Sequence, residues 1–417
     1  MPSKELQALI DELAQRTGAP IVLEDHGHTM VAYSSQNGQI DEVRRDSILR
    51  RETGSEVREW FEQYGIRHAS EPLRTPSHHG LGILGRLCAP VRFRGRLMGF
   101  LFLIDDEGRL GRAEIAAVRM AQRQAALLLY EEELAERLNA SVLTHLLAPA
   151  AEIREGAARQ LAEQGLAQAE PPHLIVYLQP TEIPAVPGAN GTAGPDLLGL
   201  LGEAMWELGR HRGHAAVLRA AREDHCVLLV KVASPEDDSA ALTLAQEARE
   251  IVIRRLEDAA PPGAAGQARV VAGIGDPQQH LTDAAVSYRR AMLAARVAAA
   301  VPSVGDLARW QDLGVFRALA QLPADEDGES CLDPRLVTLL GAPADVIRTV
   351  ETYLDQGCDA KNTAEHLHLH RTTLYYRLRK AQQLTGADLH DGNDRLALHL
   401  GFKLARLQGR YPAAPAR

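Results

Sequence analysis

Apolar residues at the start of the chain follow the two spacings that distinguish helices from strands. Four of them lie three or four residues apart and predict an amphipathic helix: Leu6, Leu9, Ile10 and Leu13. Two apolar runs, residues 20–24 and 29–34, then predict strands around a turn. The clearest strand signal is a hairpin, in which residues 84–93 and 97–104 flank Arg94-Gly95-Arg96.

A long helix is predicted directly after this hairpin, over residues 112–147. Its seam approaches heptad spacing with interruptions: Ile115, Val118, Gln122, Ala125, Leu129 and Leu138. Such a helix commonly pairs with its copy in a dimer, and the alternative is packing on the sheet of its own domain. Because Gln122 and Glu132 lie near the seam and weaken a single register, we expect this helix to transmit a ligand signal along the chain.

The middle of the chain repeats strand and helix patterns. The order strand, helix, strand, strand, helix, strand predicts an antiparallel sheet with helices on one face. The predicted strands and helices cover residues 173–179, 196–212, 216–220, 226–232, 239–257 and 270–275, and a further helix covers 279–300. Residues 180–195 form a Pro/Gly-rich loop, and the acidic residues 323–334 predict a flexible hinge.

Near the C-terminus, two short helices joined by a tight turn are predicted over residues 359–384. Asp359 is placed to cap the first helix, and Leu367 to His370 make the turn. The second helix begins at about Arg371 and repeats apolar residues on one face: Leu374, Leu378 and Ala381. A later helix, capped by Asn393, would close the bundle with a second apolar face: Leu396, Leu400, Leu404 and Leu407.

The opposite face of the second helix carries hydroxyl, amide and cationic groups. A helix in the DNA major groove uses short polar groups for base edges and cations for phosphates. We therefore expect base contacts from Thr372, Thr373 and Tyr376. Phosphate contacts are expected from Arg371, Arg377, Arg379 and Lys380, although Arg377 lies nearer the buried flank and has the alternative of a local acid.

The local charge favours the same interpretation. The whole chain has a formal net charge of −9, yet residues 361–384 carry five basic residues and only one acidic residue, Glu365. A basic helix in an acidic protein indicates a local DNA contact. The alternative is a solvated helix in a bundle. The alternating His366, His368 and His370 do not converge on one point, so we expect neither a metal nor a cofactor.

Composition restricts the class of protein. A length of 417 residues suits two to four domains, and no apolar run is long enough to span a membrane. The opening helix carries charges, unlike a signal peptide. The four scattered cysteines fit the reducing cytoplasm, and a redox-sensing thiol stays open.

The run LHLHRTTLYYRLRKAQQLTG, followed by DGNDRLALHLGFKL, resembles the C-terminal helix-turn-helix of PucR/CdaR-type bacterial transcription regulators. The resemblance covers about residues 343–408. Thr372 stands where the family usually has Asn, and Tyr375 stands where it usually has Arg. Because that Asn is a potential bidentate partner for adenine, the operator sequence does not carry over from relatives.

Two other segments resemble modules of this family. CAPVRFRGRLMGFLFLID is similar to the closing hairpin of GAF domains, which implies a sensing role without naming a ligand; the alternative is a GAF-like fold used only for dimerisation. GIGDP, followed by AAVSYRRAMLAARVA, resembles the degenerate GGDEF-like middle domain, and residues 307–319 resemble the segment after it.

A nucleotide cyclase of the GGDEF fold needs metal-binding carboxylates and a Gly-rich turn. Here the turn at residues 221–225 reads Ala-Arg-Glu-Asp-His, without glycine, and the strand end Leu178-Gln179-Pro180 has no Asp. Glu223 and Asp224 alone suit a solvated turn. We therefore expect a structural domain and no enzymatic activity.

The combined prediction is a cytoplasmic, multidomain α+β transcription regulator. It has a GAF-like sensor (1–147), a degenerate GGDEF-like domain of ferredoxin-like type (148–322), a linker (323–342) and an all-α helix-turn-helix domain (343–410). Its expected partners are double-stranded DNA, a small-molecule effector and a second copy in a homodimer, because paired half-sites supply specificity that one helix lacks. The alternatives are a signalling scaffold that uses the C-terminal bundle for protein contacts, or a cyclic-nucleotide enzyme.

Overall fold

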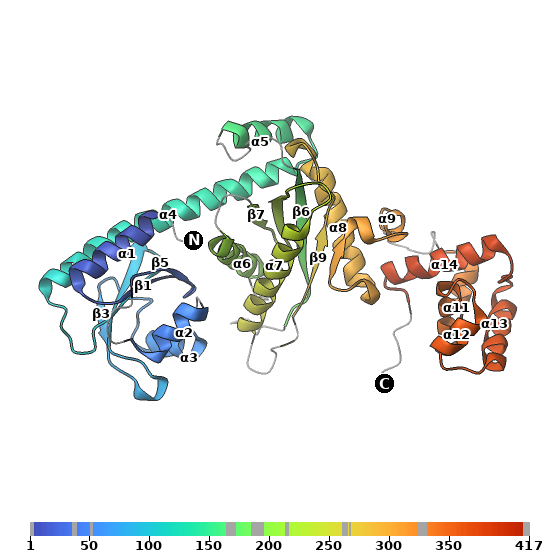
Figure 1. The fold of residues 1–417 in the computed structure, drawn as a ribbon, viewed down its shortest axis with the longest axis horizontal. Coiled ribbons are helices and arrows are strands. Elements are labelled where there is room, and N and C mark those ends of the chain that lie inside the picture. The colour runs from blue at the N-terminus through green and yellow to red at the C-terminus, as the bar shows by residue number, and fades with distance from the viewer. Residues whose placement is uncertain are drawn as a thin grey trace. The chain divides into compact units, whose positions relative to one another are not determined.

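The computed structural model of the chain contains two sheets and a C-terminal helical bundle (Figure 1). Contacts group the chain into two compact units. One holds Met1–Ala169, Pro184–Val230 and Glu250–Gly266, and the other holds Glu170–Ile183, Lys231–Arg249 and Gln267–Arg417. The structure describes residues 4–35, 40–50, 53–163, 172–184, 196–212, 217–260, 266, 268–322 and 332–411.

The first sheet is antiparallel and has the strand order β2-β1-β5-β4-β3. Its strands are β1 (Ile21–Asp25), β2 (Met30–Tyr33), β3 (Leu73–Thr75), β4 (Arg86–Phe93) and β5 (Arg96–Ile104). The predicted hairpin is therefore confirmed as β4 and β5. Its turn places Arg94 at φ 50° and Gly95 at φ 84°, and this left-handed conformation favours glycine.

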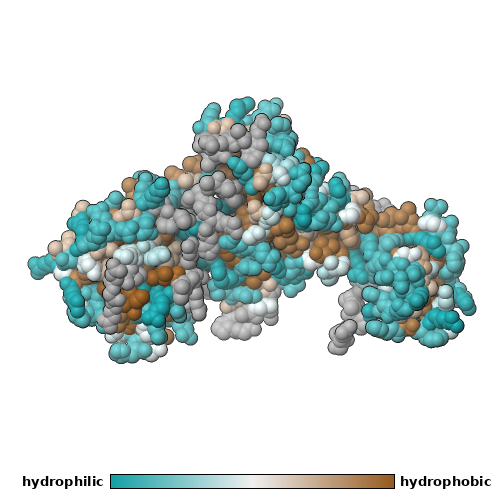
Figure 2. All heavy atoms as spheres, viewed as in Figure 1, coloured by the Kyte–Doolittle hydropathy of each residue, from teal (hydrophilic) through white to brown (hydrophobic). Residues whose placement is uncertain are grey.

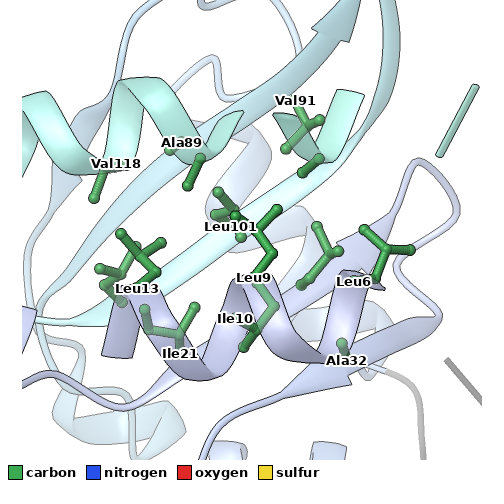
Figure 3. Close-up of a cluster of buried hydrophobic side chains, with 14 of the residues drawn as sticks. Leu6, Leu9, Ile10, Leu13, Ile21, Ala32, Ala89, Val91, Leu101 and Val118 are labelled. Atoms are coloured by element: carbon green, nitrogen blue, oxygen red, sulfur yellow. The ribbon is translucent and has the colours of Figure 1, made fainter. Parts of the chain in front are cut away.

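One face of this sheet is covered by α1 (Lys4–Thr17) and α4 (Arg112–Leu146) (Figure 3). The predicted face of the opening helix is confirmed, because all four of its apolar residues are buried in this core. Strand side chains that alternate toward the helices complete the core: Ile21, Leu23, Leu87, Ala89, Val91, Leu101 and Leu103.

The other face of the sheet meets α2 (Glu42–Arg50) and α3 (Ser55–Glu62). Phe61 of α3 lies 5.0 Å from Phe102 of β5, measured between ring centroids. These rings belong to an aromatic cluster with aliphatic neighbours: Trp60, Phe61, Ile66, Ile83, Cys88, Phe100 and Phe102. Both faces of the N-terminal sheet are therefore covered by helices.

The predicted seam of α4 faces its own domain. Val118, Ala125 and Leu129 are buried in the core beneath α1, and the side chain of Gln122 donates to the Pro90 carbonyl at 2.8 Å. The alternative of packing on its own sheet therefore holds for these positions. Leu138, the last residue of the predicted seam, is instead exposed, as are three α4 residues outside the seam: Met120, Leu127 and Leu134.

The second sheet has the order β10-β9-β6-β8-β7. Its strands are β6 (His173–Glu182), β7 (Val217–Ala221), β8 (Cys226–Lys231), β9 (Arg269–Ile274) and β10 (Leu307–Arg309). The helices before, between and after these strands are α5 (Ala151–Glu163), α6 (Leu197–Arg212), α7 (Ser239–Asp258), α8 (Ala284–Ala300) and α9 (Phe316–Leu319). The predicted strand and helix order is confirmed. The prediction missed β10, which pairs in parallel with β9 in an otherwise antiparallel arrangement.

Glycine allows α8 to pack closely on β9. A Cβ atom at Gly273 would overlap backbone atoms of Ala291 and Ala295. The Ser287 hydroxyl accepts the Ile175 N–H of β6 at 2.9 Å, so a buried polar contact also ties α8 to the sheet.

The C-terminal bundle comprises α10 (Pro334–Leu340), α11 (Ala344–Asp355), α12 (Ala360–His366), α13 (Arg371–Thr385) and α14 (Gly392–Leu407). Two details of the prediction were wrong. Residues 334–340 were assigned to a linker, whereas α10 buries Leu336 and Leu339 in the bundle core. Asp391, rather than Asn393, caps α14, since its carboxylate accepts the N–H groups of residues 393 and 394.

The apolar face of α14 is also shifted from its predicted position. Leu404 and Leu407 are buried, but Leu396 is exposed, and Leu398 and Phe402 fill the core instead. Most of the predicted hinge (residues 323–331) and most of the predicted Pro/Gly-rich loop (185–195) lie outside the described residues. Within the described ranges, no helix is both long and apolar enough to cross a membrane.

The assignment of the buried face of α4 leads to a test of stability. Leu129→Ala should lower the free energy of unfolding by about 2–5 kcal/mol, because it leaves a cavity in the core. Ile153→Ala, on an exposed position of α5 in the same unit, should change it by no more than about 0.5 kcal/mol. Urea unfolding followed by tryptophan fluorescence measures both, and equal effects would contradict the assignment.

Candidate nucleic-acid interface

Helices α12 and α13 form the predicted pair. α12 begins at the cap Asp359, whose carboxylate accepts the backbone N–H groups of Lys361 at 2.8 Å and Asn362 at 3.1 Å. Residues 367–370 make the turn, with His368 at φ 54°, and the Leu369 N–H donates to the Ala364 carbonyl at 2.9 Å. The predicted cap, turn and start of the second helix are therefore confirmed.

One face of α13 is anchored in the bundle core. Leu374, Leu378 and Ala381 are buried, and they belong to the same cluster as Val350 and Leu354 of α11. This burial fixes the rotation of α13 about its axis, since the i, i+4, i+7 positions share one face. The remaining residues of α13 are consequently directed away from the core.

The predicted contact residues differ in how much they face solvent. Arg371, Thr372, Tyr376 and Arg379 are exposed, and the exposed fraction of Tyr376 is 66%. Two others are partly buried: Thr373 and Lys380. In Figure 2 the visible surface of this bundle is largely hydrophilic. Thr372, Tyr376 and Arg379 lie on the face of α13 opposite Leu374 and Leu378.

Arg377 differs from the other cations of α13 because it already has partners within the bundle. Its guanidinium forms an ion pair with Asp345 of α11 at 2.9 Å and lies 3.4 Å from the Thr349 hydroxyl. Arg377 therefore pairs with a local acid, which was the alternative to a phosphate contact in the sequence analysis. This pair connects α13 to α11 at the edge of the buried face.

Thr372 also has a local contact. Its hydroxyl lies 2.9 Å from His370 Nδ1, and His370 caps α13 by accepting the Thr372 N–H at 3.4 Å. The hydrogen bond between the Thr372 hydroxyl and His370 Nδ1 fixes the orientation of that hydroxyl, which would otherwise rotate freely. Thr372 and His370 thus form a small rigid unit at the start of the helix.

One exposed aromatic residue was left out of the predicted site. Tyr375 has an exposed fraction of 52% and lies next to Tyr376 on the solvent side of α13. The signal was present in the sequence, because Tyr375 is three residues after Thr372 and four before Arg379, which are neighbouring positions on a helix. The exposed face therefore carries two tyrosines.

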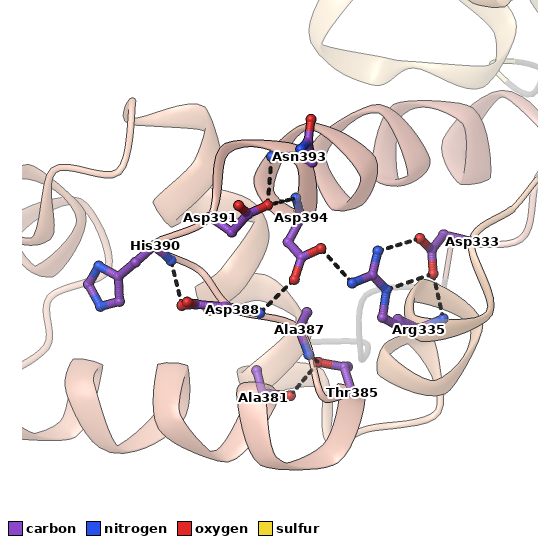
Figure 4. A network of polar contacts seen from close by, with 10 residues as sticks. All are labelled: Asp333, Arg335, Ala381, Thr385, Ala387, Asp388, His390, Asp391, Asn393 and Asp394. Carbon is purple, nitrogen blue, oxygen red and sulfur yellow. Dashed lines mark hydrogen bonds and ion pairs between the residues drawn. The ribbon is translucent and has the colours of Figure 1, made fainter.

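A polar network holds the end of α13 against α10 and α14 (Figure 4). Arg335 bridges the carboxylates of Asp394 at 2.6 Å and Asp333 at 2.9 Å. The other oxygen of Asp394 accepts the Asp388 N–H at 2.8 Å, just after α13 ends. The Asp388 N–H and the Arg335 guanidinium together lower the pKa of the Asp394 carboxyl.

The turn between β7 and β8 is where a nucleotide cyclase of the GGDEF fold would need its Gly-rich turn. The Arg222 N–H donates to the His225 carbonyl at 2.8 Å, and Asp224 pairs with His225 at 2.6 Å. Glu223 and Asp224 are exposed. Gln179 and Pro180, where a cyclase would need an acid, lie inside β6 and pair with β9.

Two cysteines are buried and unreactive in character. Burial raises the pKa of the Cys88 thiol to about 12, and burial likewise raises the pKa of Cys226. The thiolate is the form that reacts with oxidants, so neither suits redox sensing. Cys358 is partly exposed, and Cys331 lies outside the described residues.

Comparison with known proteins gives two family matches. The family described as the PucR C-terminal helix-turn-helix domain matches residues 346–404, and the family described as a GGDEF-like domain matches residues 112–297. The first match contains α12 and α13 entirely. The second extends from the start of α4 into α8.

Three curated relatives come from Bacillus subtilis (strain 168). The chain is 22% identical to the proline-responsive transcriptional activator PutR, over 96% of this chain and 97% of that protein. It is 18% identical to the DNA-binding transcriptional activator AdeR, over 96% and 93%. It is 36% identical to the purine catabolism regulatory protein over 62 residues, which are 15% of this chain and 12% of that protein.

The cap of α12 can be tested without disturbing the core. Asp359→Ala should weaken the first turn of α12 by about 0.5–2 kcal/mol, because two backbone N–H groups lose their acceptor. Hydrogen exchange of the peptide that covers α12 measures this as faster exchange. Asp359→Asn, which keeps an acceptor oxygen, is the matched control, and equal exchange in both variants would contradict the capping role.

Proposed function

We propose that this chain, a DNA-binding transcription regulator of the PucR/CdaR type, reads its operator with the exposed face of α13. The observation that carries the proposal is the rotation of this helix. Burial of Leu374 and Leu378 leaves Thr372, Tyr376 and Arg379 directed to solvent. An amphipathic helix presented in this way has the form that enters a major groove.

The exposed residues divide into two roles in this proposal. Thr372, Thr373 and Tyr376 contact base edges, and Tyr375 adds an aromatic surface beside them. Arg371, Arg379 and Lys380 contact phosphates and set affinity at a given salt concentration. Because Arg377 is engaged by Asp345, we assign it to positioning α13 rather than to the phosphates.

For the middle domain we propose a structural role without catalysis. The exposed turn at Glu223 and Asp224 has no glycine, and an internal hydrogen bond closes it between Arg222 and His225. Such a turn offers no close backbone approach to a phosphate group. The curated relatives that match most of the chain are named as transcriptional activators, in agreement with this assignment.

The N-terminal region, residues 1–147, is proposed as a GAF-like sensor of a small molecule. The support is a sheet with one face closed by α1 and α4 and the other covered by short helices over an aromatic cluster. The relative PutR is named as proline-responsive. For this chain we propose a signal of the same general kind, a small metabolite, that acts on DNA binding through α4 and the GGDEF-like domain (148–322).

We further propose that the regulator is a homodimer through the exposed stripe of α4. Met120, Leu127 and Leu134 recur at intervals of seven residues, and their exposed fractions are 58%, 46% and 44%. A seven-residue apolar repeat on the solvent side of a helix is the pattern that pairs with a second helix. Its burial would remove apolar surface from water.

Charge favours an antiparallel pair centred on Leu127. Arg123 and Glu131 are both exposed, and each lies four residues from Leu127 on opposite sides. In an antiparallel pair, Arg123 of one copy meets Glu131 of the other, and Met120 meets Leu134. A parallel pair would instead bring Arg123 toward its own copy, which like charges disfavour. The antiparallel arrangement is also two-fold symmetric, as a closed dimer requires.

Lys380→Ala tests the DNA-binding face. We expect weaker binding to every duplex, including one of random sequence, and a salt slope smaller by about one unit, because one phosphate contact is lost. Fluorescence anisotropy at several salt concentrations measures both. Lys403→Ala is the matched control, since Asp355 already pairs with Lys403 at 2.7 Å. An unchanged affinity and slope for Lys380→Ala would instead favour a protein-binding scaffold.

The dimer is tested by exchanging charges across the stripe. Arg123→Glu alone should convert the full chain to monomer and weaken operator binding, because two carboxylates then face each other. The double variant Arg123→Glu, Glu131→Arg should restore the dimer. Light scattering coupled to size exclusion measures the mass, and Ile153→Glu on α5 is the surface control. A monomeric wild type, or a dimer that ignores both changes, would refute this interface.

A further inference from the structure

Arg44 of α2 is a charged side chain enclosed within the N-terminal domain. Its exposed fraction is 1%, and one of its terminal nitrogens, Nη2, donates to the Phe102 carbonyl at 3.1 Å. The other, Nη1, is buried without a hydrogen-bond partner. No carboxylate in the described part of the chain forms an ion pair with it. A buried guanidinium in this state is costly to keep.

The two nearby carboxylates are already committed to other groups. Asp41 accepts two contacts from Arg86 Nη2, at 2.6 and 2.8 Å, and the backbone N–H groups of Arg44 and Leu84. Glu24 accepts the Thr53 hydroxyl at 2.6 Å and lies 3.0 Å from His28 Nδ1. Their oxygens are therefore occupied, and neither reaches the free nitrogen of Arg44.

Two further buried nitrogens near Arg44 lack partners. They are Arg86 Nε and His28 Nε2, on side chains with exposed fractions of 4% and 0%. Arg86 lies close enough to Arg44 that the two cations repel. Burial first, and then this repulsion, lower the pKa of Arg44 to about 9, so the group still carries its charge at neutral pH. Three buried polar atoms without a hydrogen-bond partner thus belong to this region, and buried polar groups normally have one.

We propose that this cluster, Arg44 with Arg86 and His28, binds the carboxylate of a small effector molecule. A carboxylate brings the negative charge and the acceptor oxygens that Arg44 Nη1 and Arg86 Nε lack. His28 Nδ1 lies 3.0 Å from a Glu24 carboxylate oxygen. With the proton on Nδ1, Nε2 is an acceptor, so it suits a donor group elsewhere on the ligand, such as the ammonium of an amino acid, and not the carboxylate itself. The inference rests on the proposed function, in which this domain senses a small molecule.

The side chains around the three polar groups indicate what kind of body the ligand would carry beside its carboxylate. His28 stacks on Phe100 at 4.8 Å with an interplanar angle of 11°, and Arg86 lies over the Phe61 ring at 5.4 Å. Phe61 and Phe102 are in turn 5.0 Å apart. Groups next to the cations are thus aromatic, which suits a carboxylate attached to a compact apolar body. Glu24, Arg86 and Phe102 come from three strands of one sheet face, so the site is placed on rigid elements.

Thermal unfolding of the full chain tests this assignment. The probes are acetate, benzoate, alanine, leucine and proline, each compared with its own amide at equal ionic strength. We expect at least one carboxylate to raise the Tm by about 2 °C or more, increasing with concentration, while its amide does not. If no carboxylate exceeds its amide, the proposal is overturned.

Variants at Arg44 separate binding from folding. Arg44→Met should leave the Tm of the ligand-free protein unchanged or higher, because it removes a buried charge that forms no direct ion pair, and it should abolish the carboxylate response. Arg45→Met, at the exposed neighbouring position, should keep the response. A lower Tm of ligand-free Arg44→Met, together with an unchanged rise of Tm in the presence of the carboxylate, would identify Arg44 as a structural residue and refute the site.

The same variants distinguish this proposal from the proposed function. Arg44→Met should bind a random-sequence duplex with the affinity and salt slope of the wild type, because it lies outside the DNA-binding face. If the wild type responds to no carboxylate but binds DNA normally, only the ligand assignment fails. If Lys380→Ala leaves DNA binding unchanged while the carboxylate response persists, the DNA-binding face fails and the ligand site stands.

Discussion

Burial of Leu374 and Leu378 is the constraint on which the proposed DNA-binding face depends. The free energy of these contacts sets the rotation of α13, and the rotation decides which polar residues reach solvent. The rotation alone directs Arg379 to solvent, and Thr372 has a further local contact with His370. The helices beneath, α10, α11 and α14, hold the leucines in place, and the Arg335 network secures the end of α13 through Asp394 and Asp388.

The sequence predicted features that depend on local periodicity. The apolar faces of α1 and α13, the cap Asp359 and the β4–β5 hairpin all follow from spacing or turn chemistry within a few residues. The prediction was less successful where two local signals compete. Asp391 and Asn393 are both suitable caps, and only the structure reveals that α14 begins after Asp391.

Other features depend on contacts between distant residues and have no local signal. The apolar repeat of α4 left open whether a partner helix or its own sheet covers it, because periodicity identifies an apolar face but not what covers it. In the structure its own sheet covers that face. Likewise, α10 follows an acidic segment that resembles a linker, and β10 is only three residues long. The enclosure of Arg44 arises from residues 24, 41, 86 and 102, which no pattern in the sequence connects.

The pairing of Arg377 with Asp345 separates two tasks within one helix. The side chains that hold α13 in place are largely different from those of the proposed DNA-binding face. Positions such as 372 and 375, where this chain departs from the usual family residues, can therefore change without loosening the bundle. A regulator built in this way can acquire a new target sequence by substitution on one helical face. Related proteins can thus come to bind different promoters while the helical bundle that presents α13 stays the same.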